Sequence, residues 1–315
     1  MKTKRELYKK HRPKSLKRII GQPNAVRLLE VMFEEINIPH TFLFSGPSGC
    51  GKTTLARIVK NKLGCGKLDF EELNCADVRG IDGVRRIRNR IQSAPISGDC
   101  RVWLIDEAHK LTNDAQNAFL KMLEDTPDHV YFMLATTHPQ KLLNTIRTRC
   151  TEITVKVLNY KAMGKLIRSV AKREGIKLLE ILTDEVVDKI IECSEGSARK
   201  ALVLLNQIRG LKKEEDILEA IQKSATEQVA INIARALLNP RTKWPEMVKF
   251  LKGFEEDSED IRWMVLGYAN KVLLSGGKYA SRAYLIIVAF RDHFYESKFA
   301  GLTAACYEVI VGAKE

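Results

Sequence analysis

The sequence lacks several features that would place it in a specialised class of protein. No apolar run reaches the roughly 20 residues that a membrane-spanning helix needs. The first six residues, Met1 to Glu6, are charged and contain no apolar core of the kind found in signal peptides. The chain has no repeat of fixed period and no low-complexity tract. We therefore expect a soluble globular protein that is neither secreted nor embedded in a membrane.

Paired cysteines are also missing. The seven cysteines are scattered, and none forms a C-x-x-C pair, which argues against a zinc module and is typical of reduced thiols in the cytosol. Cys65 and Cys75 are the closest pair, and we interpret them as small buried apolar residues, with a metal site as the alternative. The six histidines are equally dispersed, and His109 has no obvious second metal ligand near it.

The charge of the chain is strongly unbalanced. Its formal net charge is +13, while its hydrophobic content of 45% and charged content of 29% are ordinary for a globular protein. A basic excess of this size predicts an acidic partner, most plausibly nucleic acid, although a charge that serves only solubility is the alternative. The 315 residues suffice for two or three domains.

Residues 46–53 match the pattern G-x-x-x-x-G-K-T, which is typical of a phosphate-binding loop. Its glycines allow several backbone N–H groups to point inward and surround an anion at the start of a helix. Lys52 can reach the β- and γ-phosphates, and the Thr53 hydroxyl can bind Mg²⁺. The predicted nucleotide-contacting residues of this segment are Gly46, Pro47, Ser48, Gly49, Cys50, Gly51, Lys52, Thr53 and Thr54.

A second motif lies some fifty residues further on. The apolar run 102–105 leads directly into Asp106 and Glu107. Asp106 is placed to hold Mg²⁺, and Glu107 is placed to activate a water molecule. A short apolar run precedes the phosphate loop and a helical pattern follows it, which is the context that this motif requires. The two motifs together predict a site that hydrolyses a nucleoside triphosphate.

Apolar runs and helical patterns alternate from about residue 40 to 155. The candidate strands are 41–45, 70–74, 101–106, 130–136 and 151–155. The candidate helices are 52–63, 83–93, 113–124 and 139–147. This alternation predicts an α/β fold with a parallel sheet and helices on both faces.

The remainder of the chain is predicted to be helical. Three short amphipathic helices are expected at 160–174, 183–194 and 197–209. After a charged boundary at 210–216 the helical character continues to residue 315, with interruptions expected at Asn239-Pro240, Pro245 and Gly276-Gly277. We predict three domains, which are a nucleotide-binding domain at 1–157, a small helical domain at 158–212 and an all-helical domain at 213–315.

This plan resembles the AAA+ ATPases, and the finer wording resembles their sliding-clamp loaders. The family includes the small subunits of replication factor C and the bacterial tau/gamma subunits. Similar segments occur in the family's order over about residues 7–205, namely 10–14, 20–22, 79–85, 106–120, 132–142, 148–150 and 196–202. The resemblance implies an AAA+ domain, a lid domain that carries the second sensor and a C-terminal collar domain.

The resemblance also implies roles for individual residues, with ATP and Mg²⁺ as cofactors. Thr137 aligns with sensor 1, which helps to position the attacking water. Arg149 aligns with the arginine finger, which acts on ATP bound by the neighbouring subunit, and Arg199 aligns with sensor 2 of the lid. Arg12 and Pro13 align with the signature beside the nucleotide. An arginine can pair bidentately with phosphate oxygens, whereas an isolated arginine is more often a solvated surface charge.

The chain departs from the family in three places. His11 stands where the family usually has Tyr or Trp beside the nucleotide. Thr148 replaces the usual serine before Arg149. The bacterial tau/gamma subunits carry a four-cysteine zinc module after the phosphate-loop helix, whereas only the short segment 63–70 stands here, so no zinc is expected.

The helix expected at 83–93 is a candidate DNA-binding element. Asp82 can cap its start, and a stripe of isoleucine and valine at helical spacing is expected to pack inward, at positions 81, 84, 87 and 91. The basic residues away from this stripe, or just before the helix, are Arg79, Arg85, Arg86 and Arg90. No aromatic or Asn/Gln pair is interleaved to read bases, so phosphate contact is favoured over base contact, and a solvated basic face is the alternative.

The sequence therefore predicts the ATPase motor subunit of a sliding-clamp loader. The expected partners are other loader subunits in a pentameric hetero-oligomer, the sliding clamp and primer–template DNA, with no membrane. The expected location is the cytoplasm, or the nucleus or a viral replisome if the host is not a bacterium. The alternatives are another AAA+ DNA motor, for branch migration or for loading a helicase or initiator, and a scaffold subunit that does not hydrolyse ATP.

Overall fold

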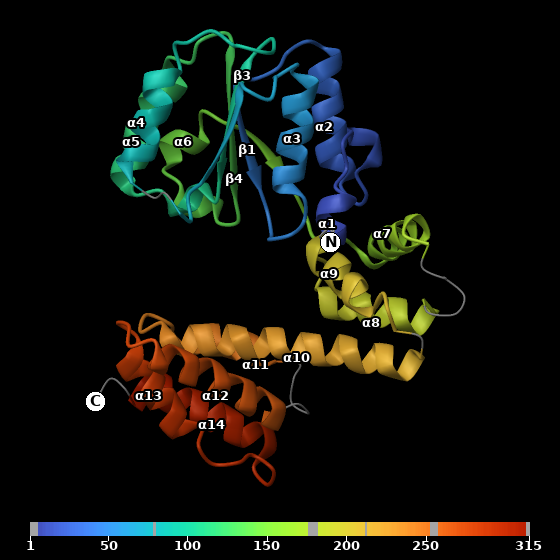
Figure 1. Ribbon diagram of the computed structural model, residues 1–315. Coiled ribbons are helices and arrows are strands. Elements are labelled where there is room, and N and C mark those ends of the chain that lie inside the picture. The colour runs from blue at the N-terminus through green and yellow to red at the C-terminus, as the bar shows by residue number, and fades with distance from the viewer. Residues whose placement is uncertain (1–5, 78–79, 176–181, 212, 253–257, 313–315) are drawn as a thin grey trace. The chain divides into compact units, whose positions relative to one another are not determined.

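The computed structural model describes residues 6–77, 80–175, 182–211, 213–252 and 258–312 (Figure 1). The chain divides into two compact units, residues 1–212 and residues 213–315. The first unit holds a parallel sheet with its helices and the three short helices that follow, and the second is wholly helical in its described residues. Arg79, one of the predicted DNA contacts, lies outside the described residues.

Five parallel strands form the sheet of the first unit. They are β1 (Thr41–Ser45), β2 (Phe70–Asn74), β3 (Arg101–Asp106), β4 (Val130–Thr136) and β5 (Thr151–Thr154). Their order is β2-β3-β4-β1-β5. All five predicted strands are confirmed, and only the last ends one residue early. Because β4 lies between β1 and β3, the loops after these three strands are neighbours at one edge of the sheet.

The central strands are buried on both faces, as parallel strands between two helical layers must be. Phe42 and Phe44 of β1 point into a core shared with α2 (Pro23–Glu34) and α3 (Lys52–Lys62). Leu43 between them points into the opposite core, with α4 (Ile81–Arg90) and α5 (Asn113–Glu124). Figure 1 shows these two helical layers on either side of the strands. Helices on both faces were predicted, and the structure confirms them.

Helix α4 differs in detail from its prediction. It begins at Ile81 rather than at residue 83, and Gly80, not Asp82, occupies the capping position. Asp82 lies in the first turn and pairs with Arg85 at 3.3 Å, so the predicted cap was wrong. Val84, Ile87 and Ile91 are buried, while the arginines at 85, 86 and 90 are exposed, which confirms the predicted orientation of the helix.

The helix expected at 139–147 is broken into two short pieces. A 3-10 turn, η3 (Pro139–Lys141), is followed by an extended residue, Leu142, and then by α6 (Asn144–Arg147). The Leu143 N–H donates to the side-chain oxygen of buried Gln116 at 2.8 Å. That hydrogen bond satisfies the amide outside a helix, so the tertiary contact overrides the local helical pattern.

Several elements at the start of the chain and after β3 were not predicted. Before β1 the chain forms α1 (Leu7–Lys10), the 3-10 turn η1 (Leu16–Arg18) and α2. A further 3-10 turn, η2 (Ala108–Lys110), follows β3. The segment from α1 to α2 matters for function because it borders the cavity described below.

Three helices follow the sheet in the same unit, at the positions that the sequence predicts. They are α7 (Tyr160–Arg173), α8 (Asp184–Ser194) and α9 (Ala198–Ile208). Each begins with a polar side chain that accepts a hydrogen bond from the backbone N–H three residues on, from Asn159, Thr183 and Ser197. These caps fix where each helix begins, and Ser197 thereby fixes the position of Arg199.

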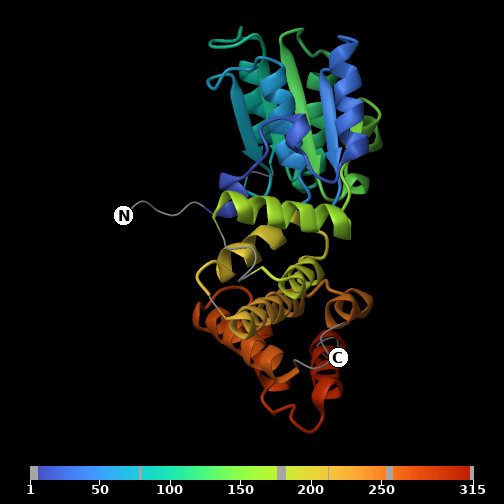
Figure 2. The same ribbon diagram turned by 90° about the vertical axis from the view of Figure 1, so that its right-hand side faces the viewer.

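The second unit consists of α10 (Glu214–Leu238), α11 (Trp244–Leu251), α12 (Ser258–Leu274), α13 (Ala280–Ala289) and α14 (Lys298–Val311) (Figure 2). They share a core that includes Ile233, Ile286 and Phe290. The predicted breaks at Asn239-Pro240 and Gly276-Gly277 are confirmed. The predicted break at Pro245 was wrong, because Pro245 stands in the first turn of α11, where its missing N–H costs nothing.

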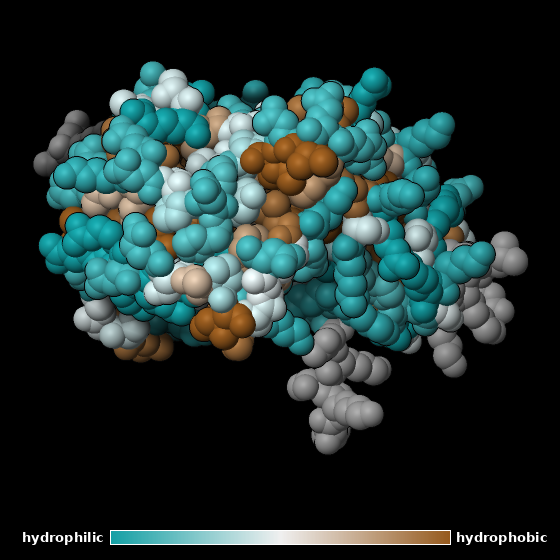
Figure 3. All heavy atoms as spheres, turned by 90° about the horizontal axis from the view of Figure 1, so that it is seen from above, coloured by the Kyte–Doolittle hydropathy of each residue, from teal (hydrophilic) through white to brown (hydrophobic). Residues whose placement is uncertain are grey.

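The surface is mainly hydrophilic where it is viewed from above, with hydrophobic side chains gathered in small patches (Figure 3). Within the described part of the chain, no helix combines the length and the apolarity needed to span a bilayer. Cys65 and Cys75 are buried, as the sequence predicts.

Candidate nucleotide-hydrolysis site

The loop between β1 and α3 depends on glycine at three positions. Gly46, Gly49 and Gly51 have φ angles of 136°, 76° and 113°, which other residues rarely adopt. A Cβ on Gly46 would lie 2.0 Å from the Val155 carbonyl oxygen. A Cβ on Gly49 would lie 2.1 Å from Ser197 Oγ. The loop is therefore packed against the end of β5 and against the first residues of α9.

Lys52 is held inside this loop. Its ammonium donates to the carbonyl oxygens of Gly46 and Pro47, both at 2.8 Å. Burial lowers the pKa of Lys52, and the nearby carboxylates, Glu107 first, partly offset that effect. A cation in this position can exchange the two carbonyl groups for phosphate oxygens without leaving the loop.

The two predicted Mg²⁺ ligands meet directly. The Thr53 hydroxyl, at the start of α3, donates to Asp106 Oδ2 at 3.1 Å. The other carboxylate oxygen of Asp106 accepts the Glu107 N–H at 3.0 Å, which fixes the orientation of the carboxylate. A hydroxyl and a carboxylate side by side offer the oxygen ligands that Mg²⁺ prefers, so these residues fit that ion.

Glu107 stands in an unusual backbone conformation next to this pair. Its φ of 52° and ψ of 42° are left-handed, which is uncommon for a residue with a side chain. His109 Nδ1 lies 3.4 Å from a Glu107 carboxylate oxygen and 3.1 Å from the Thr136 hydroxyl oxygen. Burial lowers the pKa of His109. The His109 ring therefore connects Glu107 to the end of β4.

Thr137 follows β4 directly and lies beside the same histidine pair. Its hydroxyl forms a hydrogen bond with His138 Nδ1 at 2.8 Å. The rings of His109 and His138 lie 4.8 Å apart. Thr137 is not among the described residues that line the cavity, so in this state its hydroxyl is turned toward His138.

A cavity of about 420 Å³ extends from the phosphate loop toward the N-terminal segment. It brings together most of the predicted nucleotide contacts: His11, Arg12, Pro13, Ser48, Gly49, Cys50, Gly51, Lys52, Thr53, Thr54, Asp106, Glu107 and Arg199. The lining also includes residues that the sequence analysis missed, namely Tyr8, Asn74, Lys110 and Leu158. These four come from four separate segments, and no local motif joins them.

Positive charge is concentrated around this cavity. Arg12 is half-buried, and its pKa is lowered by burial and by the neighbouring guanidinium of Arg57. The Arg199 guanidinium lies 5.5 Å from the centre of the Tyr8 ring, and the Arg199 backbone N–H donates to the Gly49 carbonyl at 3.2 Å. Cations held this close together repel one another unless a polyanion lies between them, so the arrangement favours a phosphate ligand.

His11 makes a contact that its sequence position does not suggest. Its Nε2 bonds Glu174 at the end of α7, and the same buried carboxylate pairs with Lys10 at 2.6 Å and Arg209 at 2.8 Å. The Lys10 hydrogen bond, followed by that of His11, lowers the pKa of Glu174 to about 2. This charge cluster joins α1 to the lid helices at the rim of the cavity.

Arg149 lies away from the cavity of its own chain. Its guanidinium donates to the Thr145 carbonyl at 2.9 Å and to Glu124 at 2.5 Å. Its side chain is exposed and is not among the described residues that line the cavity. An arginine placed in this way is free to contact a neighbouring molecule.

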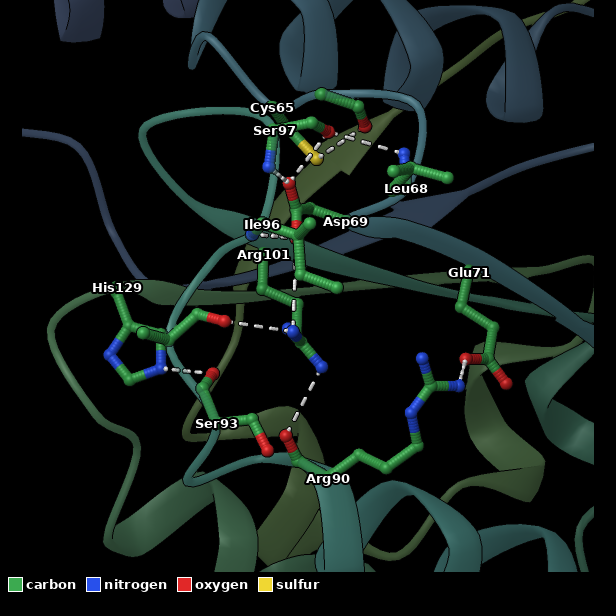
Figure 4. Close-up of polar contacts among 12 residues, drawn as sticks. Cys65, Leu68, Asp69, Glu71, Arg90, Ser93, Ile96, Ser97, Arg101 and His129 are labelled. Atoms are coloured by element: carbon green, nitrogen blue, oxygen red, sulfur yellow. Dashed lines mark hydrogen bonds and ion pairs between the residues drawn. The ribbon is translucent and has the colours of Figure 1, made fainter.

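The predicted DNA-binding arginines of α4 differ in how they are engaged. Arg90 pairs with Glu71 and lies 5.7 Å above the Trp103 ring (Figure 4). Arg85 pairs weakly with Asp82, and Arg86 forms no ion pair with any described residue. Of the three, Arg90 is therefore the most constrained by its own chain.

The end of α4 is fixed to the sheet by a buried polar network (Figure 4). The Arg101 guanidinium donates to the carbonyls of Arg90 and Ala94 at 3.3 and 3.0 Å. It also lies 3.7 Å from Asp69, whose carboxylate accepts the Ile96 N–H at 2.6 Å. The network holds α4 rigidly, with its arginines facing solvent.

Family models match two parts of the chain. A model described as DNA polymerase III, delta subunit, matches residues 74–159. A model described as magnesium chelatase, subunit ChlI, matches residues 15–99.

Similar sequences come from bacteria. A DNA polymerase III subunit gamma of Buchnera aphidicola is 33% identical over 276 residues, which are 80% of this chain and 71% of that protein. A gamma/tau subunit of Mycobacterium tuberculosis is 35% identical over 225 residues, or 64% of this chain. The chain spans 38% of the length of that mycobacterial protein.

A solved structure shares the fold. The Thermotoga maritima RuvB Holliday junction branch migration motor superposes with a TM-score of 0.56, covering 70% of this chain and 78% of that one, at 23% identity. At this identity the likeness concerns the fold alone, and it confirms the predicted AAA+ fold class.

Proposed function

Because the chain belongs to the family of DNA polymerase III gamma and gamma/tau subunits, we propose that it is the ATPase motor subunit of a sliding-clamp loader. The observation that supports this most strongly is the contact between Thr53 and Asp106 at 3.1 Å, with Glu107 next in the chain. A subunit that only served as a scaffold would have no need of this arrangement.

Nucleotide binding would use the cavity between the phosphate loop and the N-terminal segment. Backbone N–H groups of the glycine loop surround the phosphates, and Lys52 turns from the carbonyls of Gly46 and Pro47 to the β- and γ-phosphates. Arg12 and Pro13 lie on the opposite side of the cavity, beside the nucleoside. Arg199 reaches the γ-phosphate from the lid, whose helix α9 already contacts Gly49 through its backbone.

Hydrolysis would use the residues at the ends of β3 and β4. Thr53 and Asp106 hold Mg²⁺, which neutralises charge that develops on the phosphate oxygens. Glu107 takes a proton from the attacking water, and Thr137 orients that water after turning from His138. Arg149 completes the site of a neighbouring subunit, because its guanidinium is exposed and absent from the cavity of its own chain in the described residues.

We further propose that the chain works in a pentameric hetero-oligomer in the cytoplasm, with a sliding clamp and primer–template DNA as partners. ATP binding opens the clamp, and hydrolysis releases it on DNA. Arg85 and Arg86 of α4 contact phosphates of the duplex, since both are exposed and only weakly engaged within the chain. Arg90 contributes less, because Glu71 already holds it.

Phosphate release tests this proposal. The full chain, with its partner subunits, is assayed for ATP hydrolysis alone, with clamp, with primer–template DNA and with both. We expect the highest rate with clamp and primer–template together. A branch-migration motor would instead respond to four-way junctions and ignore the clamp, and a scaffold subunit would release no phosphate attributable to its own Lys52.

A further inference from the structure

A second groove opens beside the nucleotide cavity, and its lining is strongly basic. It has a volume of about 930 Å³ and lies between residues 10–23 and one face of α7. The basic residues that line it are Lys10, His11, Arg12, Lys14, Lys17, Arg18, Lys161, Lys165 and Arg173. No aspartate or glutamate is among the described residues of the lining. The groove shares His11, Arg12 and Arg18 with the nucleotide cavity, whereas the α7 residues Lys161, Lys165 and Arg173 line this groove alone.

Most of these cations are available to a ligand. Six of them form no ion pair with any residue that the structure describes, namely Lys14, Lys17, Arg18, Lys161, Lys165 and Arg173. All six are exposed. The nearby carboxylate of Glu174 is fully buried and already pairs with Lys10, His11 and Arg209, so it does not neutralise the groove.

Helix α7 carries this charge at a cost to its own stability. Its 14 residues contain five cations and no carboxylate. Lys161 and Lys165 are four residues apart, where like charges repel, and Lys161 lies in the first turn, at the positive end of the helix dipole. A face that served only solubility would interleave both signs of charge. The uncompensated pattern indicates a polyanionic ligand.

We propose that this groove is a second binding site for the sugar–phosphate backbone of DNA, separate from helix α4. Lys161 and Lys165 are separated by a rise of about 6 Å along α7, and Arg173 lies about 12 Å beyond Lys165, so the cations follow a line rather than a point. The described lining contains no aromatic residue on which a base could stack, apart from the imidazole of His11. Contact is therefore with phosphates and is independent of sequence.

The groove and α4 belong to different sides of the sheet. The groove includes Pro23, the first residue of α2, and α2 covers the face opposite to α4. Figures 1 and 2 show α7 on the α2 side of the strands. A DNA segment in the groove is thus distinct from a duplex along α4. The proposal extends the proposed function by adding a DNA contact, but it does not depend on ATP hydrolysis.

The test compares two double variants of the same helix in the full chain. Lys161→Glu/Lys165→Glu reverses two charges in the groove, whereas Arg168→Glu/Lys172→Glu reverses two charges elsewhere on α7. Fluorescence anisotropy with a labelled duplex, without nucleotide, gives the affinity over a range of salt concentrations. We expect the groove variant to lose at least about tenfold in affinity near 0.1 M salt, with its slope of log affinity against log salt shallower by about two. The control variant should stay within about threefold of wild type.

Further measurements keep the result interpretable. ATP affinity and thermal melting check that each variant is folded, and Lys161→Gln/Lys165→Gln should show a smaller loss in the same direction. Equal losses in the groove and control variants would overturn the proposal, because bulk charge alone would then explain binding. Stronger competition by poly-glutamate than by DNA would overturn it in favour of an acidic protein partner. If ATP hydrolysis is absent but the groove variant still loses DNA affinity, the proposed function fails and this inference stands.

Discussion

The hydroxyl of Thr53 donates a hydrogen bond to a carboxylate oxygen of Asp106 at 3.1 Å, although the two residues are 53 positions apart. The contact joins the start of α3 to the end of β3 and so unites the two motifs on which the account depends. It places a pair of oxygen ligands at the mouth of the phosphate loop. The predictions below concern the residues around this pair.

Glu107→Gln should bind ATP normally but hydrolyse it at least ~10²-fold more slowly, because the amide keeps the shape of the side chain and loses its basicity. Nucleotide affinity and single-turnover hydrolysis are measured separately. Glu34→Gln, at the exposed end of α2, is the matched control and should change neither. Near wild-type turnover in the Glu107 variant would remove this residue from the mechanism. Lys52→Ala should instead weaken nucleotide binding itself.

His109→Ala should lower the maximal rate of hydrolysis by about tenfold and leave the Michaelis constant nearly unchanged. The imidazole lies 3.4 Å from the Glu107 carboxylate and bonds Thr136, so it positions Glu107 without touching the nucleotide cavity lining. A loss of about 1.4 kcal/mol, the worth of one hydrogen bond to a charged group, corresponds to that factor. His129→Ala, whose ring contacts Ser93 elsewhere, is the control. An unchanged maximal rate would show that His109 has no such role.

Arg149→Ala should leave ATP binding by the isolated subunit intact and reduce hydrolysis in the assembled oligomer by up to ~10³-fold. Arg149 currently pairs with Glu124 on the surface, outside its own cavity. Mixtures of the Arg149 variant with a Lys52-defective chain provide the measurement. Interfaces that combine an intact phosphate loop with a neighbour's intact Arg149 should recover activity. A defect confined to a proven monomer, with no recovery in any mixture, would contradict action between subunits.

Glu174→Gln should destabilise the first unit by about 1–3 kcal/mol, because three cations lose a buried charged partner. The pKa of Glu174 is lowered from 4.5 to about 2, chiefly by Lys10. Its stabilising contribution is therefore fully present above about pH 4.5 and is lost as the pH falls toward 2. Urea unfolding of wild type and variant should show a difference that shrinks over this range. Glu192→Gln, an exposed control, should show almost none, and a difference that does not depend on pH would refute the assignment.

The sheet was predictable because each strand is an apolar run with a clear end. Strand 101–106 is apolar throughout until Asp106, and the structure begins and ends it at the predicted residues. Helix 139–147 was not predictable, since its local pattern is helical while Gln116, far along the chain, captures the Leu143 amide. Pro245 misled for a related reason, because a proline in the first turn of a helix reads the same in sequence as a break.

The candidate site was predictable only where a motif names its residues. The phosphate loop and Asp106 lie together as their spacing implies. Tyr8 and Lys110 belong to no motif, so only the folded chain places them in the cavity. The Glu174 cluster joins residues separated by 163 positions, and no pattern in the sequence indicates which of many glutamates would be buried among cations. The roles of Thr137, Arg149 and Arg199 stay predictions.

Transfer of a labelled sliding clamp onto primed circular DNA is the most direct measurement of the central claim. The full chain is combined with its partner subunits, clamp, DNA and ATP, and DNA-bound clamp is separated by gel filtration. We predict clamp on DNA with ATP and the wild-type chain, and none with Lys52→Ala. With Glu107→Gln, clamp should stay bound to the loader instead of being released. Loading that proceeds equally well with Lys52→Ala, or no loading by an assembly that hydrolyses ATP, would contradict the account.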